Sequence, residues 1–457
     1  MSFGDVRNKK VVVLGLARSG LAAASLLIRK GAQVVGSDML TREDLSEEII
    51  DLEAQGARIE CGGHSEGLLE GAECVVISPG VPPDLPLLQR ARARGLAVVG
   101  EIEAASWFCR APIVAVTGSN GKTTTTALLG QIFERDGRNV VVAGNIGSPF
   151  SAVADHIPSE GIAVVEVSSF QLESIDQFRP EVSVMLNLSP DHLDRHGGYD
   201  AYVAAKARIF ENQDESDVAV LNGDDQGVMA LAEKIRSRIV PFSVRKRLDE
   251  GVYLSQGALV AHLSGLAEQV CAVEEIRLPG PHNLSNVAAA LAVAETFDVD
   301  PAHFREALRD FSGVEHRLEW VAEVGGVTFV NDSKATNVVS VQCGLQSFQG
   351  PIILIAGGRE KGTDFTPLRQ LVAERVKLLI LIGEATPKLK RALGGVVETV
   401  EAESMEEAVN RGFGAAQKGD CILLSPACAS FDMYQNFEER GARFKEAVHH
   451  IATRDRR

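Results

Sequence analysis

The stretch 113–126, IVAVTGSNGKTTTT, constrains the fold of this chain most strongly. Residues 113–116 are apolar, which is typical of a buried β-strand, and an apolar helical stripe begins at Ala127. Between strand and helix stand two glycines, a lysine and several hydroxyl side chains. This order predicts a phosphate-binding loop, in which backbone N–H groups and the helix N-terminus hold phosphate. Lys122 would reach the outer phosphates, and Thr123 is placed to bind Mg²⁺.

The loop departs from the general phosphate-loop pattern at one position. The pattern G-x-x-x-x-G-K-[ST] requires glycine where this chain has Val116. The form present is the shorter T-G-x-x-G-K-T. The alternative is an ordinary turn with a surface lysine, and the strand before the loop and the helix after it disfavour that interpretation.

Length and charge restrict the class of protein. A chain of 457 residues suggests about three domains. The net charge of −16 argues against binding to nucleic acid or to an anionic membrane. The seven cysteines form no C-x-x-C pair, so we expect neither a disulfide framework nor a zinc site. With no signal peptide and no apolar run of about 18 residues, we expect a cytoplasmic protein.

The first predicted domain, residues 1–110, contains a βαβ unit. A buried strand at 11–14 is followed by G-x-A-x-x-G from Gly15 to Gly20, and Asp38 lies 18 positions further on. This is a dinucleotide-binding pattern with its middle glycine replaced, and it indicates a nucleotide diphosphate near the turn. A Rossmann-like layer without nucleotide stays an alternative. Ser78 follows another buried strand, at 74–77, and joins the candidate site because ligands bind at the carboxyl ends of parallel strands.

The central predicted domain, residues 111–313, places polar residues after buried strands. Glu166 ends a strand at 162–165 and could bind the Mg²⁺ of a nucleotide, although a salt bridge at the strand end is the alternative. The polar turn 189–197 follows a strand at 184–188, and its density of acid and imidazole groups favours a site. Asn283 and Asn286 could cap the helix that begins at 287 or contact a nucleotide. The residues around Lys206 favour a solvated helix lysine.

The third predicted domain, residues 314–457, repeats this layout. Strands at 327–330, 352–356, 378–382 and 421–424 each end in a polar or glycine-rich turn. Arg317, Lys334 and Lys361 supply cations suited to phosphate and carboxylate in an otherwise acidic chain. The whole pattern predicts an α/β chain of three domains: Rossmann-like, a central P-loop-type ATPase domain with a mostly parallel sheet, and a second Rossmann-like domain.

Taken together, the ordered motifs resemble one family, the ATP-dependent Mur ligases of peptidoglycan precursor synthesis. The resemblance spans Gly15 to Phe444 and rests on T-G-S-N-G-K-T-T, G-N-I-G, E-V-S-S-F-Q-L, D-H-L-D-R, A-A-K-x-R-I-F, G-x-H-N, H-R-L-E, N-D-S-K-A-T-N, G-G-x-x-K-G and L-S-P-A-C-A-S-F-D. Within the family, S-S-F-Q-L-E and the C-terminal motif S-P-A-C-A-S-F-D-x-Y-x-N-F-E-x-R-G are most similar to the branch that adds D-glutamate. The D-N-P-R block of the diaminopimelate- or lysine-adding branch is absent.

The resemblance implies a reaction and its cofactors. ATP phosphorylates the carboxylate of UDP-N-acetylmuramoyl-L-alanine, and the amine of D-glutamate attacks the acyl phosphate through a tetrahedral intermediate. The resemblance implies two Mg²⁺ sites. It also implies that Lys206 is carbamylated, whereas its sequence neighbours alone favour a solvated helix lysine. Carbamylation requires the neutral amine, so the surroundings of Lys206 must lower its pKa. We also expect domain closure and a monomer.

The resemblance further implies roles for individual residues. Catalysis is assigned to Lys122, Glu166, His192 and Lys206, and Mg²⁺ binding to Thr123, Glu166, His192 and Lys206. ATP binding is assigned to Gly118, Ser119, Asn120, Gly121, Lys122, Thr123, Thr124, Asn283, Arg317, Asp332 and Lys334. Substrate binding is assigned to Leu16, Asp38, Ser78, Asn145, Ser168, Thr336, Lys361, Ser430 and Phe437.

Three other functions are weaker interpretations. An NAD-dependent oxidoreductase would explain only residues 15–38. A nucleotide-binding regulator without catalysis predicts a damaged metal site, yet Lys122, Thr123, Glu166, His192 and Lys206 are all present. A folylpolyglutamate synthase is disfavoured by the Rossmann-like first domain.

Overall fold

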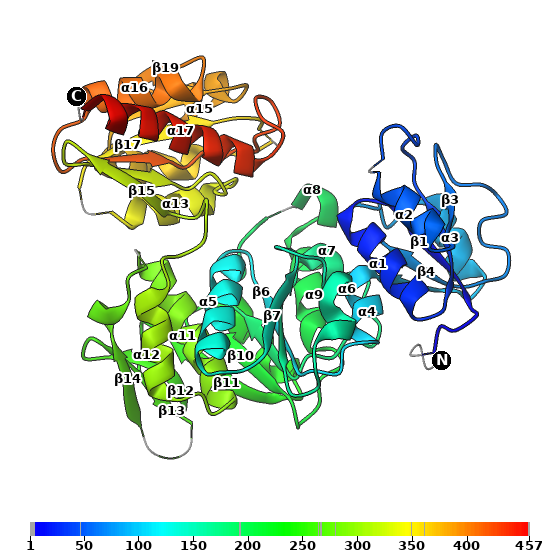
Figure 1. The fold of residues 1–457 in the computed structure, drawn as a ribbon. Helices are drawn as coiled ribbons and strands as arrows, with labels where there is room; N and C mark the ends of the chain where they lie inside the picture. The colour runs from blue at the N-terminus through cyan, green and yellow to red at the C-terminus, as the bar shows by residue number, and fades with distance from the viewer. Residues whose placement is uncertain are drawn as a thin grey trace. The chain divides into compact units, whose positions relative to one another are not determined.

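The computed structural model contains three β-sheets, each flanked by helices (Figure 1). It describes residues 5–45, 47–191, 193–263, 265, 267–278, 280–348, 350–360 and 362–455; side chains of 193, 194, 454 and 455 are excluded. The chain forms two compact units. The first comprises Met1–Val273 with Asn286–Leu308, and the second Glu274–Ser285 with Arg309–Arg457. The predicted α/β class is confirmed.

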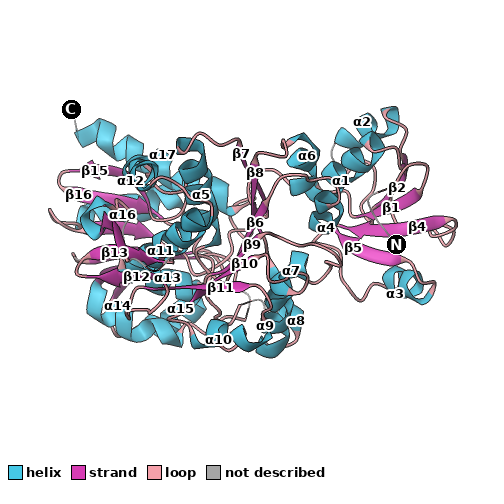
Figure 2. Ribbon diagram, turned by 90° about the horizontal axis from the view of Figure 1, so that it is seen from below, coloured by secondary structure: helices cyan, strands magenta, loops and turns pink. Residues whose placement is uncertain are grey.

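The first sheet is fully parallel, with strand order β3-β2-β1-β4-β5. Its strands are β1 (Lys10–Leu14), β2 (Gln33–Ser37), β3 (Arg58–Glu60), β4 (Ala72–Ile77) and β5 (Ala97–Gly100). Its helices are α1 (Arg18–Arg29), α2 (Glu48–Ala54), α3 (Pro86–Ala93) and α4 (Glu101–Ser106). Alternate residues of β1 enter two separate cores, so helices cover both faces of the sheet (Figure 2). This order is that of dinucleotide-binding folds, as predicted.

The second sheet has the order β14-β13-β12-β11-β10-β9-β6-β8-β7. Its strands are β6 (Ile113–Thr117), β7 (Val140–Gly144), β8 (Ile162–Glu166), β9 (Val182–Met185), β10 (Val218–Asn222), β11 (Arg238–Ser243), β12 (Gly251–Ser255), β13 (Ala258–His262) and β14 (Glu268–Ala272). All pairs from β7 to β12 are parallel, whereas β13 pairs antiparallel with β12 and with β14. The sheet is thus mostly parallel, with an antiparallel extension at one edge.

Helices of very different length accompany this sheet. They are α5 (Lys122–Arg135), α6 (Phe150–Val153), α7 (Ser169–Leu172), α8 (Leu193–His196), α9 (Tyr199–Ala207), α10 (Gln226–Met229), α11 (Pro281–Thr296) and α12 (Pro301–Asp310), with 3₁₀ turns η1 (Ala154–His156), η2 (Arg208–Phe210), η3 (Ala232–Lys234) and η4 (Val273–Glu275). The strand register places the carboxyl ends of β6, β8 and β9 at one level of the sheet, because Val116 of β6 pairs with Glu166 of β8 and with Val184 of β9. The phosphate loop therefore begins between the ends of β8 and β9.

The third sheet has the order β15-β16-β20-β17-β18-β19. Its strands are β15 (Glu319–Val324), β16 (Val327–Asn331), β17 (Ile352–Gly357), β18 (Val376–Ile382), β19 (Glu398–Glu401) and β20 (Cys421–Leu424). Only β15 is antiparallel. Its helices are α13 (Val338–Gln346), η5 (Thr366–Leu368), α14 (Arg369–Arg375), α15 (Thr386–Leu393), α16 (Met405–Ala415) and α17 (Phe437–Asp455). Two cores, one on each face of the sheet, make it the second doubly covered layer of the Rossmann type.

Candidate active site

The phosphate loop joins β6 to α5 as the sequence predicts. Gly118 and Gly121 have φ angles of +150° and +86°, a region that L side chains rarely adopt. A Cβ on Gly121 would also lie 2.3 Å from Asn286 Oδ1. Lys122 Nζ lies 2.8 Å from the carbonyl oxygen of Gly118 and 3.0 Å from that of Ser119, and it donates to both. The lysine ammonium therefore lies against the concave side of the loop.

Two residues that the sequence analysis did not single out hold this loop. Asn187 accepts a hydrogen bond from Asn120 N at 2.8 Å and donates one to Asn120 O at 3.0 Å. The hydroxyl of buried Tyr202 lies 2.7 Å from Ser119 Oγ. Asn187 could have been found from its position after β9, whereas Tyr202 looks like any core aromatic residue on a helix.

Glu166 ends β8 beside the loop and is buried. Its Oε1 accepts a hydrogen bond from Asn145 Nδ2 at 2.8 Å. Its Oε2 is also buried, and the described residues offer it no hydrogen-bond partner. A buried carboxylate oxygen without a partner is costly. The oxygen, beside a loop suited to phosphate, therefore fits the Mg²⁺ that the loop implies. Thr123 and Thr124 are buried in the first turn of α5.

Lys206 is buried rather than solvated, with 2% of its surface exposed. The expectation from its sequence neighbours is thus wrong, because α9 turns this side chain toward β6. Its Nζ donates to the Gly118 carbonyl at 2.9 Å and to Thr117 Oγ1 at 3.3 Å. Burial and then the charge of Lys122 hold the pKa of Lys206 well below its usual value, while Asp191 and Glu166 oppose the shift. The surroundings favour the neutral amine, as the resemblance requires.

Two predicted site residues, His192 and Lys361, lie outside the described residues. Their neighbours in sequence are described. Asp191 is partly buried and within electrostatic range of Lys206, and Glu360 pairs with Lys388.

The predicted substrate residues of the first sheet lie together at its carboxyl edge. Asp38 accepts hydrogen bonds from the backbone N–H of Leu16 at 2.6 Å and of Leu40 at 2.9 Å. Asp38 therefore shapes the turn after β1. The side chain of Leu16 is buried in the core, so the turn presents its backbone to a ligand. Ser78 is also buried, and its N–H bonds the Leu14 carbonyl at 2.9 Å.

Two arginines connect this edge with the second sheet. Arg18 donates to the Gly147 carbonyl at 2.5 Å, within the G-N-I-G turn that also holds Asn145. Arg195 donates to the Pro79 carbonyl at 3.0 Å, next to Ser78. The first bond ties α1 to the turn that carries Asn145, and the second ties α8 to the turn that carries Ser78.

In the second unit, Asp332 follows β16 and is buried. It accepts from Ser425 Oγ at 2.9 Å and from Leu318 N at 3.2 Å. Burial raises the pKa of Asp332 to about 7, against the opposing effects of Ser425 and the Arg317 charge.

Asn283 is also buried, but α11 begins at Pro281. Of the two alternatives for Asn283 and Asn286, helix capping is therefore wrong, because both lie inside the helix.

The other predicted residues of this unit surround the ends of β16 and β20. Lys334 Nζ lies 5.2 Å from the ring centroid of Phe437, and the Phe437 carbonyl accepts from Ser333 Oγ at 2.7 Å. Ser430 is buried and Thr336 is exposed.

Buried Arg440 was not assigned a role from the sequence, although it stands in the C-terminal motif. It bonds the Ser333 carbonyl at 2.8 Å and the Cys428 carbonyl at 3.1 Å, so it fixes these two loops. Burial lowers its pKa to about 10.

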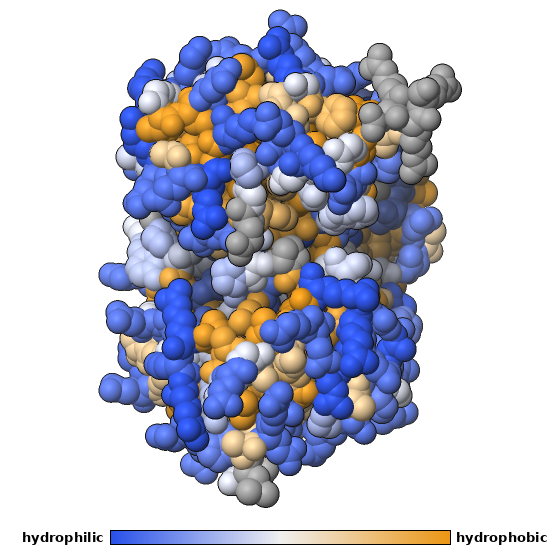
Figure 3. All heavy atoms as spheres, turned by 90° about the vertical axis from the view of Figure 1, so that its left-hand side faces the viewer, coloured by the Kyte–Doolittle hydropathy of each residue, from blue (hydrophilic) through white to orange (hydrophobic). Residues whose placement is uncertain are grey.

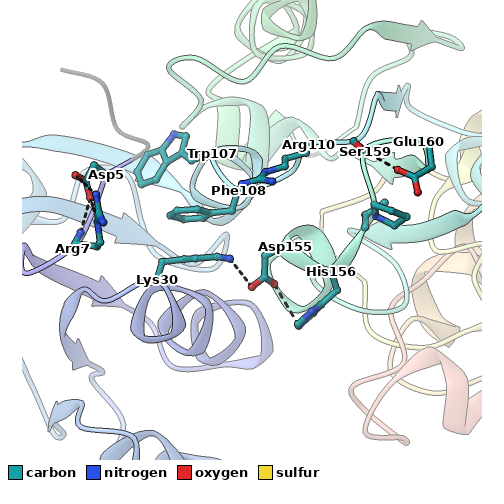
Figure 4. A pocket seen from close by; sticks show the side chains of 12 residues that line it. Asp5, Arg7, Lys30, Trp107, Phe108, Arg110, Asp155, His156, Ser159 and Glu160 are labelled. Carbon is teal, nitrogen blue, oxygen red and sulfur yellow. Dashed lines mark hydrogen bonds and ion pairs between the residues drawn. The ribbon is translucent and has the colours of Figure 1, made fainter.

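A cavity of about 750 Å³ lies at the opposite edge of the first unit (Figure 4). Its lining residues precede β1, β6 and β8 or follow α1 and α4, so they stand near the amino ends of the strands. None of the predicted site residues that the structure describes lines it. Arg7 pairs with Asp5 at 2.9 Å, and Lys30 pairs with Asp155 at 3.0 Å. These ion pairs balance much of its charge, and we assign it no ligand.

Hydrophilic side chains cover most of the face shown in Figure 3, with smaller hydrophobic areas between them. Across the described parts of the chain, the helices all fall short of the length and apolar character that crossing a membrane demands.

Comparison with known proteins is consistent with this geometry. The chain matches a Mur ligase MurD-like N-terminal domain over residues 9–100, a Mur ligase middle domain over 116–294 and a Mur ligase glutamate ligase domain over 316–428. It is 46% identical to a UDP-N-acetylmuramoylalanine–D-glutamate ligase of Acidobacterium capsulatum, covering 97% of each chain. It is 47% identical to the protein of the same name from Pelotomaculum thermopropionicum, covering 97% of this chain and 98% of the relative.

Solved structures share the fold at lower identity. A MurF ligase from Thermotoga maritima in complex with ADP has a TM-score of 0.61 and 18% identity, covering 98% of this chain and 97% of the other. A UDP-N-acetylmuramate-alanine ligase, MurC, from Thermotoga maritima has a TM-score of 0.59 and 20% identity, covering 97% and 99%. Because the three matched domains span most of the sequence and the relatives are similar over nearly their whole length, this chain belongs to the Mur ligase family.

Proposed function

We propose that this Mur ligase uses ATP to join D-glutamate to UDP-N-acetylmuramoyl-L-alanine, a step of peptidoglycan precursor synthesis. The observation that carries the proposal is the similarity of 46–47% over 97% of the chain to enzymes named for adding D-glutamate. The site chemistry is consistent with it, since a phosphate loop, a buried carboxylate and a buried lysine meet at one sheet edge.

The reaction follows from the chemistry of a carboxylate, which is a poor electrophile. An oxygen of the substrate carboxylate attacks the γ-phosphorus of ATP, and the bond to the ADP oxygen breaks. The D-glutamate amine then attacks the acyl carbon, and phosphate leaves from the tetrahedral intermediate while the amine loses a proton. The protein contributes positioning and charge neutralisation, because phosphoryl transfer needs little else from side chains.

In this proposal each group at the loop has one task. Lys122 and the loop N–H groups neutralise the outer phosphates. Thr123 and Glu166 would hold one Mg²⁺, and the unpartnered Oε2 of Glu166 supports that role. Bound Mg²⁺ supplies positive charge against the phosphate oxygens. His192 and a carbamylated Lys206 would hold a second Mg²⁺.

Carbamylation of Lys206 is a separate step. CO₂ adds to the neutral Nζ, the amine loses a proton, and the product carries a negative charge. The lowered pKa of Lys206 supports the step, because it leaves the nucleophilic amine unprotonated.

The other site residues keep the roles that the resemblance gives them. We propose that Leu16, Asp38, Ser78, Asn145 and Ser168 bind the UDP-linked substrate, and that Asn283, Arg317, Asp332 and Lys334 complete the ATP site. Thr336, Lys361, Ser430 and Phe437 would bind D-glutamate. The domains would be residues 1–110, 111–313 and 314–457. A cytoplasmic monomer is consistent with free cysteines throughout and with all proposed residues on one chain.

The decisive experiment measures phosphate release with UDP-N-acetylmuramoyl-L-alanine and ATP while the amino acid is varied. D-Glutamate should support rapid release, and L-glutamate, D-aspartate, meso-diaminopimelate and L-lysine should not. Rapid release with any of these four but not with D-glutamate would overturn the assigned specificity.

Lys361→Ala tests the predicted D-glutamate site. Removing the cation that meets a substrate carboxylate should raise the KM for D-glutamate far more than the KM for ATP. Steady-state kinetics with each substrate varied in turn measure both values. Equal increases would count against the role.

A further inference from the structure

Ser169, Glu173 and His196 form a hydrogen-bonded cluster, with Glu173 partly exposed, that the proposed reaction does not use. His196 Nδ1 lies 2.8 Å from Glu173 Oε1, and His196 Nε2 lies 3.0 Å from Ser169 Oγ. Only 1% of the His196 side chain is exposed, and Ser169 is equally deep at 3%. Because a carboxylate accepts hydrogen bonds, Nδ1 carries a hydrogen and the ring orientation is fixed.

Aromatic contacts complete the surroundings of His196. Its ring stacks on Phe170, with centroids 5.2 Å apart and planes inclined by 17°. It meets Tyr202 edge-on, with centroids 5.4 Å apart. The guanidinium of Arg195 lies 3.9 Å from the Phe170 ring centroid, and the same arginine bonds the Pro79 carbonyl.

These contacts join three segments that carry the proposed machinery. Ser169 begins α7, three residues after Glu166 and next to Ser168. Tyr202 is one turn before Lys206 in α9, and its hydroxyl bonds the phosphate loop at Ser119. His196 itself ends α8 and therefore lies between the segment that follows β8 and helix α9. The ring thus contacts both the segment that follows Glu166 and the helix that carries Lys206.

The order serine, histidine, carboxylate also matches the triad of serine hydrolases. That role does not fit here, because buried Ser169 is fixed in the first turn of α7 behind the capping box of Ser168 and Gln171. A nucleophile must reach its substrate. The cluster is better suited to holding other groups in place.

We propose that His196 is a positioning residue of the ligase reaction, which sets the distance between Glu166 and Lys206 through its bonds to Glu173 and Ser169. The inference rests on the proposed function, since these two residues matter as metal-binding groups. Partners of this kind typically change metal affinity or activity by about 10–100-fold when removed.

The test uses the full chain and His196→Phe, which keeps a ring against Phe170 and Tyr202 but loses both hydrogen bonds. Ser169→Ala and Glu173→Gln each alter one of the two bonds. The matched control is His303→Phe, since His303 Nδ1 also lies 2.8 Å from a carboxylate, that of Asp136. Asp136 follows α5, a helix of 14 residues, and so lies about 20 Å from the phosphate loop.

Phosphate release is measured against Mg²⁺, ATP, UDP-N-acetylmuramoyl-L-alanine and D-glutamate, together with the thermal unfolding temperature. We expect His196→Phe to raise half-saturating Mg²⁺ by about 10-fold or more and to lower kcat, with the KM for D-glutamate within about 2-fold of wild type. Ser169→Ala and Glu173→Gln should show smaller changes in the same direction. His303→Phe should leave all kinetic values unchanged.

The proposal fails if the cluster variants lose thermal stability but keep wild-type Mg²⁺ dependence and kcat, because the cluster would then be structural only. If His196→Phe does not fold, Ser169→Ala and Glu173→Gln decide by the same criterion. A wild type that releases no phosphate with any amino acid would refute the ligase function instead. In that event, Mg²⁺-dependent binding of a non-hydrolysable ATP analogue to wild type and variants still tests the positioning.

Discussion

At the scale of residues, the candidate site depends on ionisable groups that burial has moved from their usual behaviour. Lys206 is driven toward its neutral form, and Asp332 is driven toward its protonated form. Both follow from the cost of placing charge away from water. Shifts of this size concentrate at functional sites, so they support the assigned roles independently of the motifs.

Lys206→Ala should lower ligase activity by about 100-fold or more. Removing a metal ligand, or a group that orients one, typically reduces activity on this scale. A short-chain carboxylic acid should restore part of the rate by replacing the lost anion. Phosphate release with and without added acid measures this, alongside intact mass of the wild type. Full activity of an unmodified Lys206 in bicarbonate would contradict carbamylation.

Asp332 predicts a pH effect on stability. Its pKa is raised from 3.8 to about 7 in the folded chain, so the folded state binds more protons between these values. The stability contribution of the protonated carboxyl is therefore present below about pH 4 and is lost as pH rises toward 7. The stability of the Asp332→Asn protein against unfolding should fall less between pH 4 and 7 than that of the wild type. The unfolding temperature of the wild type minus that of Asp332→Asn, measured across this range without nucleotide, should fall as pH rises; a constant difference would exclude the effect.

At the scale of elements, the site is built at the joins between strands and the segments that follow them. Register aligns Val116, Glu166 and Val184, so the loop, the carboxylate and the segment that follows β9 start at one level. Positive φ at Gly118 and Gly121 then turns the chain tightly enough for Lys122 to face the loop carbonyls. The geometry of these joins is thus set by backbone as much as by side chains.

Gly121→Ala tests this turn. Its φ of +86° and the 2.3 Å approach of Asn286 Oδ1 mean that alanine strains the backbone and displaces a neighbour. We expect a KM for ATP raised by about 10-fold or more and a loss of about 1 kcal/mol or more in stability. Gly137→Ala is the control, since its φ is +76° with open space around it at the far end of α5. Equal effects of both substitutions on the KM for ATP would refute the local explanation.

At the scale of the whole molecule, the proposed ATP residues are divided between two compact units. Gly118 to Thr124 lie in the first, and Asn283, Arg317, Asp332 and Lys334 lie in the second. Binding of one nucleotide by all of these residues, as proposed, predicts domain closure. Such closure would also keep water from the acyl phosphate.

Small-angle scattering measures closure directly. The radius of gyration should fall when a non-hydrolysable ATP analogue and UDP-N-acetylmuramoyl-L-alanine are added with Mg²⁺. A Lys122→Ala protein, with weakened phosphate binding, should change less under the same conditions. An unchanged radius in the wild type at saturation would contradict shared binding.

The sequence by itself determined much of this protein. Short apolar runs identified most strands, and the polar residues after them located the edges where the site lies, because ligands meet parallel sheets at their carboxyl ends. The loop at Thr117–Thr123 and Glu166 could be assigned from local order alone. Strands β3, β10 to β15 and β19 were not identified, and the helix starting at Pro281 was placed too late.

Only the tertiary structure decided what depends on distant packing. Periodicity gives the faces of an element but not its neighbours, so Lys206 looked solvated until α9 was seen to turn it toward β6. Tyr202 and His196 stand outside the quoted motifs, and their partners Ser119 and Ser169 lie 83 and 27 residues away in the sequence. Burial, pKa and hydrogen-bond partners are properties of the assembled fold, and the roles proposed for these side chains depend on them.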